Sequence, residues 1–210
     1  IPWPWAFVIT ELTIHPRRTP MVHPTKAMQI KMQIEIIVST PCPAWLIDLP
    51  EAVTTAQAAV SAVIADAGLA HPMIEIGVTL TDDADLRRLN RKYRQQDKPT
   101  NILSFTGDTA FDPAFDPANV APLLLGDIVL AHGVVGAEAR AQGKTMFAHY
   151  CHLLVHGSLH LLGQDHSDEG DAKAMEIREV AILASIGIAD PYQVMDRSAN
   201  VDKPASVDLK

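Results

Sequence analysis

Apolar and polar residues alternate along the chain with two periods, which predict strands and helices. Strands are predicted where β-branched or alternating apolar residues form short runs. These runs are 33–39, 74–80, 102–105 and 126–131. Helices are predicted where apolar residues recur every three or four positions. They lie between Asp48 and Gly68, from Asp82 or Asp83 to Arg94, and over 132–142, 145–162 and 169–186.

The order of these elements is β-α-β-α-β-β-α-α-α. It predicts an α+β fold, in which a small mixed four-stranded β-sheet has about five helices packed on it. Asp48 is predicted to cap the first helix, with Pro50 in its first turn and Gly68 as its stop. Residues 106–122, which include Gly107 and three prolines, are predicted to form a loop.

One domain with an extension at each end is expected from a chain of 210 residues. Residues 1–32 hold five of the fifteen prolines and show no sustained period. We expect them to be a disordered extension or the product of an over-extended reading frame, with Met28 or Met32 as the natural start. Residues 33–190 are predicted to form the single domain, and residues 191–210 a polar C-terminal tail.

Composition excludes several classes of protein. Seventeen Lys and Arg against 25 Asp and Glu give a formal charge of −8, which argues against coating nucleic acid by bulk charge. No uncharged apolar run approaches the roughly 20 residues of a membrane helix, so no membrane partner is expected. The first residues lack the basic leader and cleavage site of a signal peptide. Two cysteines, Cys42 and Cys151, indicate a reducing compartment, and we expect a cytoplasmic protein.

Histidine is over-represented, with five of the nine residues between positions 149 and 166. His156 and His160 are four residues apart and therefore lie one turn apart on a helix. Gly163 can end that helix, and a short turn then lets His166 approach from a third direction. Three histidines with one open position are the donor set of catalytic zinc, although imidazole also binds Ni²⁺, Co²⁺ and Cu²⁺. The sequence therefore predicts one metal ion per chain, held by His156, His160 and His166.

Neighbouring residues leave alternatives open. His152, His156 and His160 form a competing triplet, but it spans two helical turns, about 11 Å, which is long for one ion. His149 and His152 are expected to line the cleft, support the ligands or pack in the core. Asp165 can either orient a ligand imidazole or cap the turn.

The residue after the first ligand distinguishes this pattern from that of metalloproteases. H-E-x-x-H enzymes carry a glutamate there as general base, whereas this chain has Gly157. Hydrolysis would then depend on the lowered pKa of metal-bound water, on the substrate's own groups or on a residue from elsewhere in the chain. We therefore disfavour a metalloprotease.

A second group of candidate residues lies between positions 86 and 105. It contains six of the seventeen cations, most of them expected on a solvated helix face: Arg87, Arg88, Arg91, Lys92, Arg94 and Lys98. Arg94 differs because it stands where the helix ends, and a guanidinium there can clamp a phosphate through two hydrogen bonds. A metal site together with a positioned arginine predicts phosphodiester hydrolysis.

Three motifs carry a resemblance to a known family. LNRKYRQQDKPTNILSF, LLGDIV and HGSLHLLGQDH, in this order and spacing, closely resemble the YbeY family of bacterial rRNA-maturation endoribonucleases. The similarity covers about residues 33–195. It departs from the family pattern at Gln164, where a tyrosine is common, and in the extension at 1–32.

The resemblance implies a single-strand-specific, zinc-dependent endoribonuclease domain with an α+β fold. It implies processing of the 3′ end of small-subunit rRNA and ribosome quality control. Expected partners are RNA and the small ribosomal subunit with its proteins, and no DNA. By position, His156, His160 and His166 match the zinc ligands, and Arg94 matches an arginine that the family treats as functionally important. The alternative is a non-catalytic ribosome-assembly factor with a structural zinc.

Overall fold

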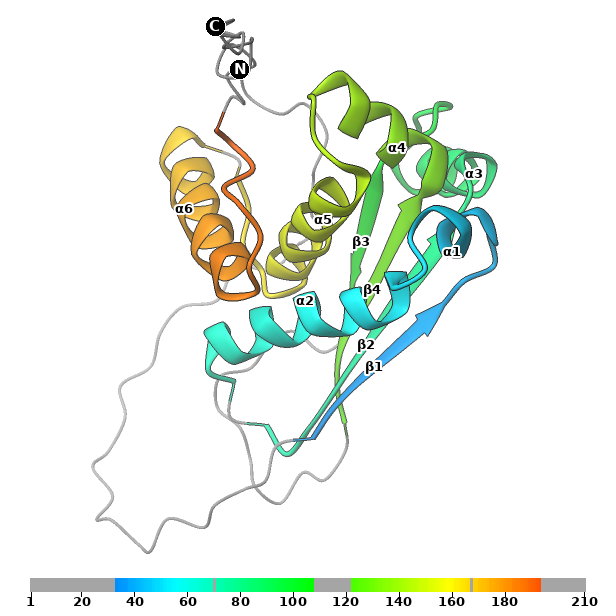
Figure 1. Cartoon of the computed structure of the whole chain (residues 1–210). Helices are drawn as coiled ribbons and strands as arrows, with labels where there is room; N and C mark the ends of the chain where they lie inside the picture. The colour runs from blue at the N-terminus through cyan, green and yellow to red at the C-terminus, as the bar shows by residue number, and fades with distance from the viewer. Residues whose placement is uncertain (1–32, 70, 108–121, 167, 194–210) are drawn as a thin grey trace, which may run out of the picture.

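The computed structural model describes residues 33–69, 71–107, 122–166 and 168–193. Its centre is one four-stranded sheet (Figure 1). The strands are β1 (Gln33–Ser39), β2 (Met73–Thr81), β3 (Ile102–Thr106) and β4 (Leu123–Ala131). They lie in the order β1-β2-β4-β3, with the first three of these parallel and β3 antiparallel to β4. The predicted mixed four-stranded sheet is thus confirmed.

Six helices accompany the sheet in the described part of the chain, against about five predicted. They are α1 (Ala44–Asp48), α2 (Ala52–Ala67), α3 (Asp83–Arg94), α4 (His132–Ala141), α5 (Met146–Leu161) and α6 (Glu169–Ser185). None of the described helices has both the length and the apolar character needed to cross a bilayer. The α+β class predicted from the order of elements is confirmed.

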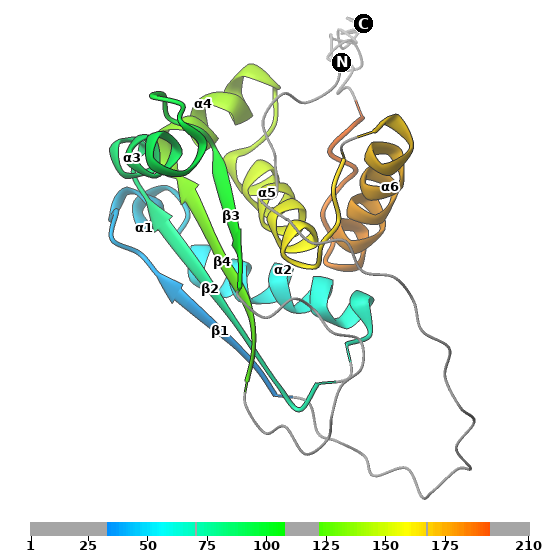
Figure 2. The same ribbon diagram turned by 180° about the vertical axis from the view of Figure 1, so that it is seen from behind.

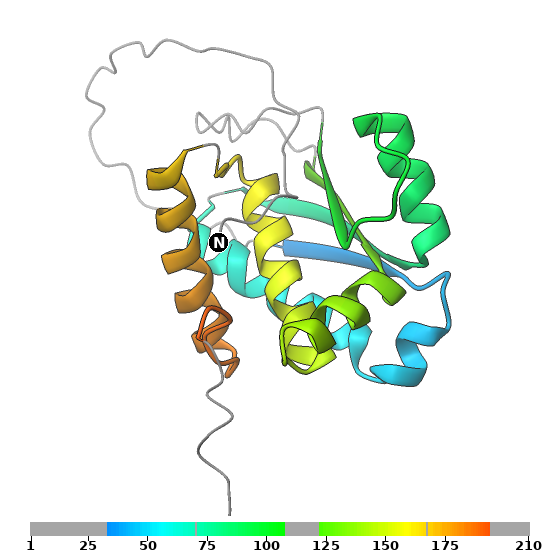
Figure 3. The same cartoon turned by 90° about the horizontal axis from the view of Figure 1, so that it is seen from above.

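Each face of the sheet has its own helical cover. Along β4, Ile128 and Leu130 point into the main core with α2 and α5, whereas Val129 and Ala131 join a smaller core beneath Leu86 of α3. This alternation follows from the two-residue period of a strand. Figure 2 and Figure 3 show α3 on one side of the sheet and α5 on the other, with α6 packed outside α5.

The start of the first long helix differs from the prediction. A short helix, α1, ends at Asp48, and α2 begins after Pro50 with Glu51 as its N-cap. The predicted cap by Asp48 is wrong, because the Asp48 carboxylate instead lies 2.9 Å from His132 Nε2. The cause is Trp45, whose buried indole N–H donates to the Thr81 carbonyl oxygen over 3.0 Å and holds the extra turn in place.

Strand β4 is irregular near its start, where it pairs with β2 and β3. β4 starts at Leu123, three residues before the predicted strand, and its pairing with β2 shifts in register between Glu75 and Ile76. Gly126 takes a φ of 129° there, and a Cβ on it would lie 2.0 Å from the Phe105 carbonyl oxygen. Most of the predicted loop, residues 108–121, lies outside the described residues, as do the predicted extension 1–32 and most of the predicted tail.

Candidate metal centre

Helix α5 is the buried element that carries the candidate ligands. Thr145 caps its first turn, since the Thr145 hydroxyl accepts a hydrogen bond from the Ala148 N–H over 3.1 Å. Most of its side chains are buried among β3, β4 and the neighbouring helices. A helix enclosed in this way holds its side chains in defined directions, which a metal site requires.

Gly157 faces the sheet and not the candidate ligands. The Ser104 hydroxyl on β3 donates to the Gly157 carbonyl oxygen over 3.2 Å. A Cβ at position 157 would lie 2.7 Å from Ile102 Cδ1 and 3.0 Å from Ser104 Oγ. The glutamate of an H-E-x-x-H motif has no space at this position, which gives a packing reason for its absence from the sequence.

The structure brings His156, His160 and His166 together. Each offers one ring nitrogen, and these three atoms lie within 4.8 Å of one another. His156 Nε2 and His160 Nε2, one turn apart on α5, are separated by 3.0 Å. Gly163, with a φ of 82°, turns the chain after α5, and the His166 ring then stacks at 5.6 Å from the His156 ring. The convergence predicted from the spacing is therefore present.

Hydrogen bonds at the other ring nitrogens determine which atoms face the centre. His160 Nδ1 donates to the Gln164 carbonyl oxygen over 2.8 Å, because a carbonyl oxygen only accepts. His156 Nδ1 donates to the Glu179 carboxylate over 2.7 Å. In the neutral rings both Nε2 atoms then carry lone pairs directed at the same point. Two nitrogens on one tetrahedral zinc lie about 3.4 Å apart, so this donor set fits a divalent ion.

The electrostatic surroundings favour the neutral imidazole that a metal requires. Burial lowers the pKa of His160 to about 4, with a further contribution from the nearby His156. For Glu179, burial alone would raise the pKa, but hydrogen bonds from His152 and His156 outweigh it and hold the pKa below its ordinary value. At neutral pH the centre therefore pairs a neutral His160 with an ionised Glu179.

The remaining histidines of α5 do not join the cluster. His152 Nε2 lies 2.9 Å from Glu179 Oε2, so His152 supports the carboxylate that contacts His156. His149 is fully buried, and its Nε2 lies 2.9 Å from a carboxylate oxygen of Glu138. The competing triplet of His152, His156 and His160 is thus not the group that converges.

Two other candidate site residues, Asp165 and Arg94, lie in different parts of the fold. The Asp165 carboxylate accepts the His166 backbone N–H over 2.8 Å and also acts electrostatically on His160, so both predicted roles, cap of the turn and support of a ligand ring, stay predictions. Arg94 is the last residue of α3 and is half-buried, and burial lowers its pKa. The adjacent Tyr93 ring contacts Phe105 of β3 at 5.1 Å. Arg94 therefore comes from a helix on the face of β3 opposite α5, which carries His156 and His160, with His166 in the turn that follows.

Two residues of this centre escaped the sequence-based prediction: Glu179 on α6 and Tyr192. The Glu179 carboxylate is 1% exposed and accepts a short hydrogen bond from the Tyr192 hydroxyl. The signal was present, since Glu179 falls on the buried stripe of α6 with Met175, Ile182 and Leu183. A charged residue on an apolar stripe is rarely buried without a specific partner.

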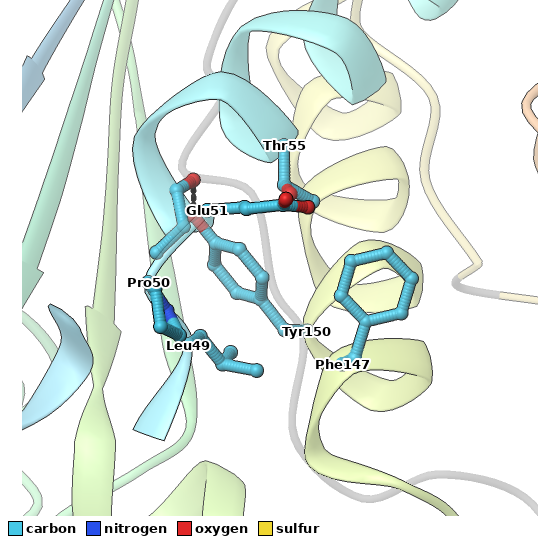
Figure 4. A pocket seen from close by; sticks show the side chains of 7 residues that line it. Leu49, Pro50, Glu51, Thr55, Phe147 and Tyr150 are labelled. Carbon is cyan, nitrogen blue, oxygen red and sulfur yellow. Dashed lines mark hydrogen bonds between the residues drawn. The ribbon is translucent and has the colours of Figure 1, made fainter. Parts of the chain in front are cut away.

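A separate pocket lies near the other end of α5 (Figure 4). Its lining includes Leu49, Pro50, Phe147 and Tyr150, and its volume is about 210 Å³. The Tyr150 hydroxyl donates to the Ala52 carbonyl oxygen over 2.9 Å. The lining is mostly apolar and contains none of the histidines, so this pocket is distinct from the metal centre.

Fold and site together define a class: an α+β protein in which a buried helix and the turn after it bring together three histidines that could hold one metal ion. The family described as "Endoribonuclease YbeY" matches residues 45–187. Many curated relatives share that description. One from Paramagnetospirillum magneticum is 45% identical over 159 residues, which cover 76% of this chain and 96% of the relative. Another, from Azorhizobium caulinodans, is 45% identical over 163 residues, covering 77% and 96%.

The chain therefore belongs to the endoribonuclease YbeY family. A solved structure, the solution structure of TM1509 from Thermotoga maritima, aligns over 80% of this chain and 100% of its own. Its identity is 19% and its TM-score 0.42, a weak likeness, so the family assignment rests on the family match and the curated relatives.

Proposed function

We propose that this protein is a single-strand-specific endoribonuclease that holds one Zn²⁺ with His156, His160 and His166. The observation that carries this proposal is the convergence of three ring nitrogens within 4.8 Å in a chain of the endoribonuclease YbeY family. Three protein ligands leave one position open, as in catalytic and not structural zinc sites. The relatives' shared description supports RNA as the substrate.

Two features of the chain's own residues define the chemistry of the site. The Gln164 carbonyl oxygen and the Glu179 carboxylate each fix one imidazole with its Nε2 toward the centre. Gly157 packs against Ser104, so position 157, the place of the glutamate in an H-E-x-x-H motif, supplies no general base. When bound, a zinc ion at such a site lowers the pKa of a water ligand and polarises a phosphoryl oxygen.

Arg94 is proposed to bind the scissile phosphate. It ends α3, and β3, which lies between α3 and α5, is an edge strand of the sheet. For one phosphate to meet both Arg94 and the metal site, the Arg94 side chain must extend past this edge toward the face that carries α5. A guanidinium remains charged despite the lowered pKa and can donate two hydrogen bonds to a phosphate.

The cellular role that we propose is maturation of rRNA, at the 3′ end of the small-subunit RNA, and ribosome quality control in the cytoplasm. Partners would be the small ribosomal subunit and its proteins, and neither DNA nor a membrane. The three sequence motifs support this role, and residues 33–190 are proposed as the endoribonuclease domain, with 1–32 and 191–210 as extensions.

The test is cleavage of a single-stranded RNA by the purified protein. Activity should disappear with a chelator, return with zinc, and be absent for the same RNA in a duplex. His160→Ala, purified identically, controls for contaminating nuclease; it should lose zinc by elemental analysis and lose cleavage, with nearly unchanged far-UV circular dichroism. Full zinc occupancy in this variant would show that the ligand assignment is wrong.

A second candidate is a ribosome-assembly factor in which zinc only links α5 to the turn that follows it. The absence of a carboxylate at position 157 favours this alternative, whereas the open three-ligand site disfavours it. Zinc-replete protein that binds the RNA without cutting it would support the assembly factor and contradict the nuclease.

A further inference from the structure

Glu179 joins α6 to the candidate metal centre through three hydrogen bonds. Its Oε1 accepts from His156 Nδ1 over 2.7 Å, and its Oε2 accepts from His152 Nε2 over 2.9 Å. The Tyr192 hydroxyl donates a short bond to Oε2 and also lies 3.2 Å from His152 Nε2. Both carboxylate oxygens are thus occupied, and only one of them contacts a candidate ligand.

The orientation of this carboxylate determines which nitrogen of His156 is available to a metal. A neutral imidazole carries one N–H, and an acceptor at Nδ1 places the proton there and leaves the lone pair on Nε2. His156 Nε2 is the atom that faces His160 Nε2 at 3.0 Å. If Nε2 carried the proton, it would fill the space that the ion requires.

We propose that Glu179 is a positioning residue of the metal centre, and that Tyr192 and His152 orient its carboxylate. Glu179 holds the Nδ1–H form of His156 and directs Nε2 of that ring at the ion. This inference rests on the proposed metal site. It makes α6 and the residue at position 192 part of the centre, although neither supplies a ligand.

A purely structural role explains the arrangement less well. Glu179 stands on α6 between Met175 and Ile182, on a stripe that is otherwise apolar. A buried ion pair is weak evidence for stability, because well-packed apolar residues of similar volume often do as well or better. Carboxylates bonded to ligand imidazoles instead orient the ring and make it a stronger donor, which raises metal affinity.

The experiment compares two substitutions with different hydrogen-bonding capacity. Glu179→Met keeps the approximate volume and removes the acceptor, whereas Glu179→Gln keeps one acceptor oxygen and removes the charge. Zinc affinity is measured by competition with a chromophoric chelator. We expect a loss of about 10- to 100-fold for Glu179→Met and a smaller loss for Glu179→Gln. Glu35→Gln, an exposed carboxylate on β1 at the opposite edge of the sheet, should bind as the wild type does.

A second measurement separates positioning from general loosening of the fold. Nitrogen-15 NMR of the metal-free protein reports which ring nitrogen carries the proton. In Glu179→Met, His156 should shift toward the Nε2–H form, while His160, whose Nδ1 donates to the Gln164 carbonyl oxygen, should not change. Equal shifts at both rings would show a structural effect and overturn the proposal.

If Glu179→Met does not fold, Tyr192→Phe tests the positioning role of Glu179 instead, because it retains the carboxylate and removes one hydroxyl. We expect a several-fold loss of zinc affinity. Wild-type affinity together with an unchanged His156 ring would overturn the proposal. Because neither measurement uses RNA, a protein that binds zinc but does not cut RNA would contradict the proposed nuclease activity and leave this inference standing. A wild-type chain that binds no zinc would overturn both.

Discussion

Ser104 on β3 and Gly157 on α5 are joined by a hydrogen bond from the serine hydroxyl to the glycine carbonyl oxygen, 3.2 Å long. The helix approaches the sheet so closely here that a side chain at position 157 would meet Ile102 and Ser104. His156 stands immediately before this contact and His160 one turn after His156. The position of the two histidines relative to the sheet is therefore set by a residue without a side chain.

Gly157→Ala should destabilise the protein. The added Cβ would lie 2.7 Å from Ile102 Cδ1, and overpacking of a close-packed core costs about 1–3 kcal/mol. Urea unfolding of the metal-free protein measures this cost. Gly136→Ala on α4 is the matched control, since its Cβ would meet Arg140 Nη1 at 3.4 Å and Met146 Sδ at 3.7 Å. That variant should gain up to about 1 kcal/mol from helix propensity; equal effects at both positions would contradict the packing argument.

Arg94→Glu should retain zinc and lose RNA cleavage. Reversal of the charge removes the phosphate contact, and loss of one such donor at a reacting centre costs about 10²-fold in rate. The assay is cleavage of single-stranded RNA, with zinc content determined on the same sample. Arg88→Glu provides the comparison, because Arg88 is exposed on the same helix and pairs with Asp85. If Arg94→Glu cuts RNA as the wild type does, Arg94 has no part in the mechanism.

Only one of the two cysteines should react with a thiol reagent in the folded protein. Both are free; Cys151 is buried in α5, and burial raises the pKa of its thiol to about 12. The thiolate is the reactive form, so Cys151 should be inert to Ellman's reagent at pH 8 until the chain unfolds. Cys42 is only half-buried and should react first. Rapid modification of two thiols per native chain would contradict the burial of Cys151.

The metal-free protein should lose stability on mild acidification. Burial lowers the pKa of His160 to about 4, whereas the unfolded chain takes up a proton near pH 6.5. Between these values the unfolded state binds more protons, so the free energy of unfolding falls as the pH falls, by about 3 kcal/mol at most from this residue. Burial lowers the pKa of His152 as well, which acts in the same direction.

Urea unfolding at pH 7.0 and pH 4.5, with a chelator present, measures this dependence. The pKa of Glu179 lies below the ordinary value of a glutamate. The stability that its ionised carboxylate contributes is therefore complete above that ordinary value and is lost only as the pH falls below it. His160→Gln removes one titrating group and should reduce the difference between the two pH values. A wild-type protein equally stable at both would refute the prediction.

Local spacing alone determined the three candidate ligands. His156 and His160 are one helical turn apart, and Gly163 allows the reversal that brings in His166, all within eleven consecutive residues (156–166). Such short-range geometry follows from the pitch of the helix and the conformational freedom of glycine. The strand and helix periods likewise predicted the α+β class and most element bounds. Family resemblance, also visible in the motifs, indicated the nuclease.

Tertiary structure alone decided what surrounds those ligands. Glu179 reaches His156 from a different helix, and Tyr192 reaches Glu179 from the chain beyond that helix; no periodicity relates such distant positions. The turn of α1 is too short to show a period and exists because Trp45 is buried against β2. In the sequence, Gly157 likewise looks like an ordinary helix position; only the packing of β3 against it shows that no side chain fits there. Sequence patterns record contacts a few residues apart, whereas packing between elements depends on distances that only the folded chain defines.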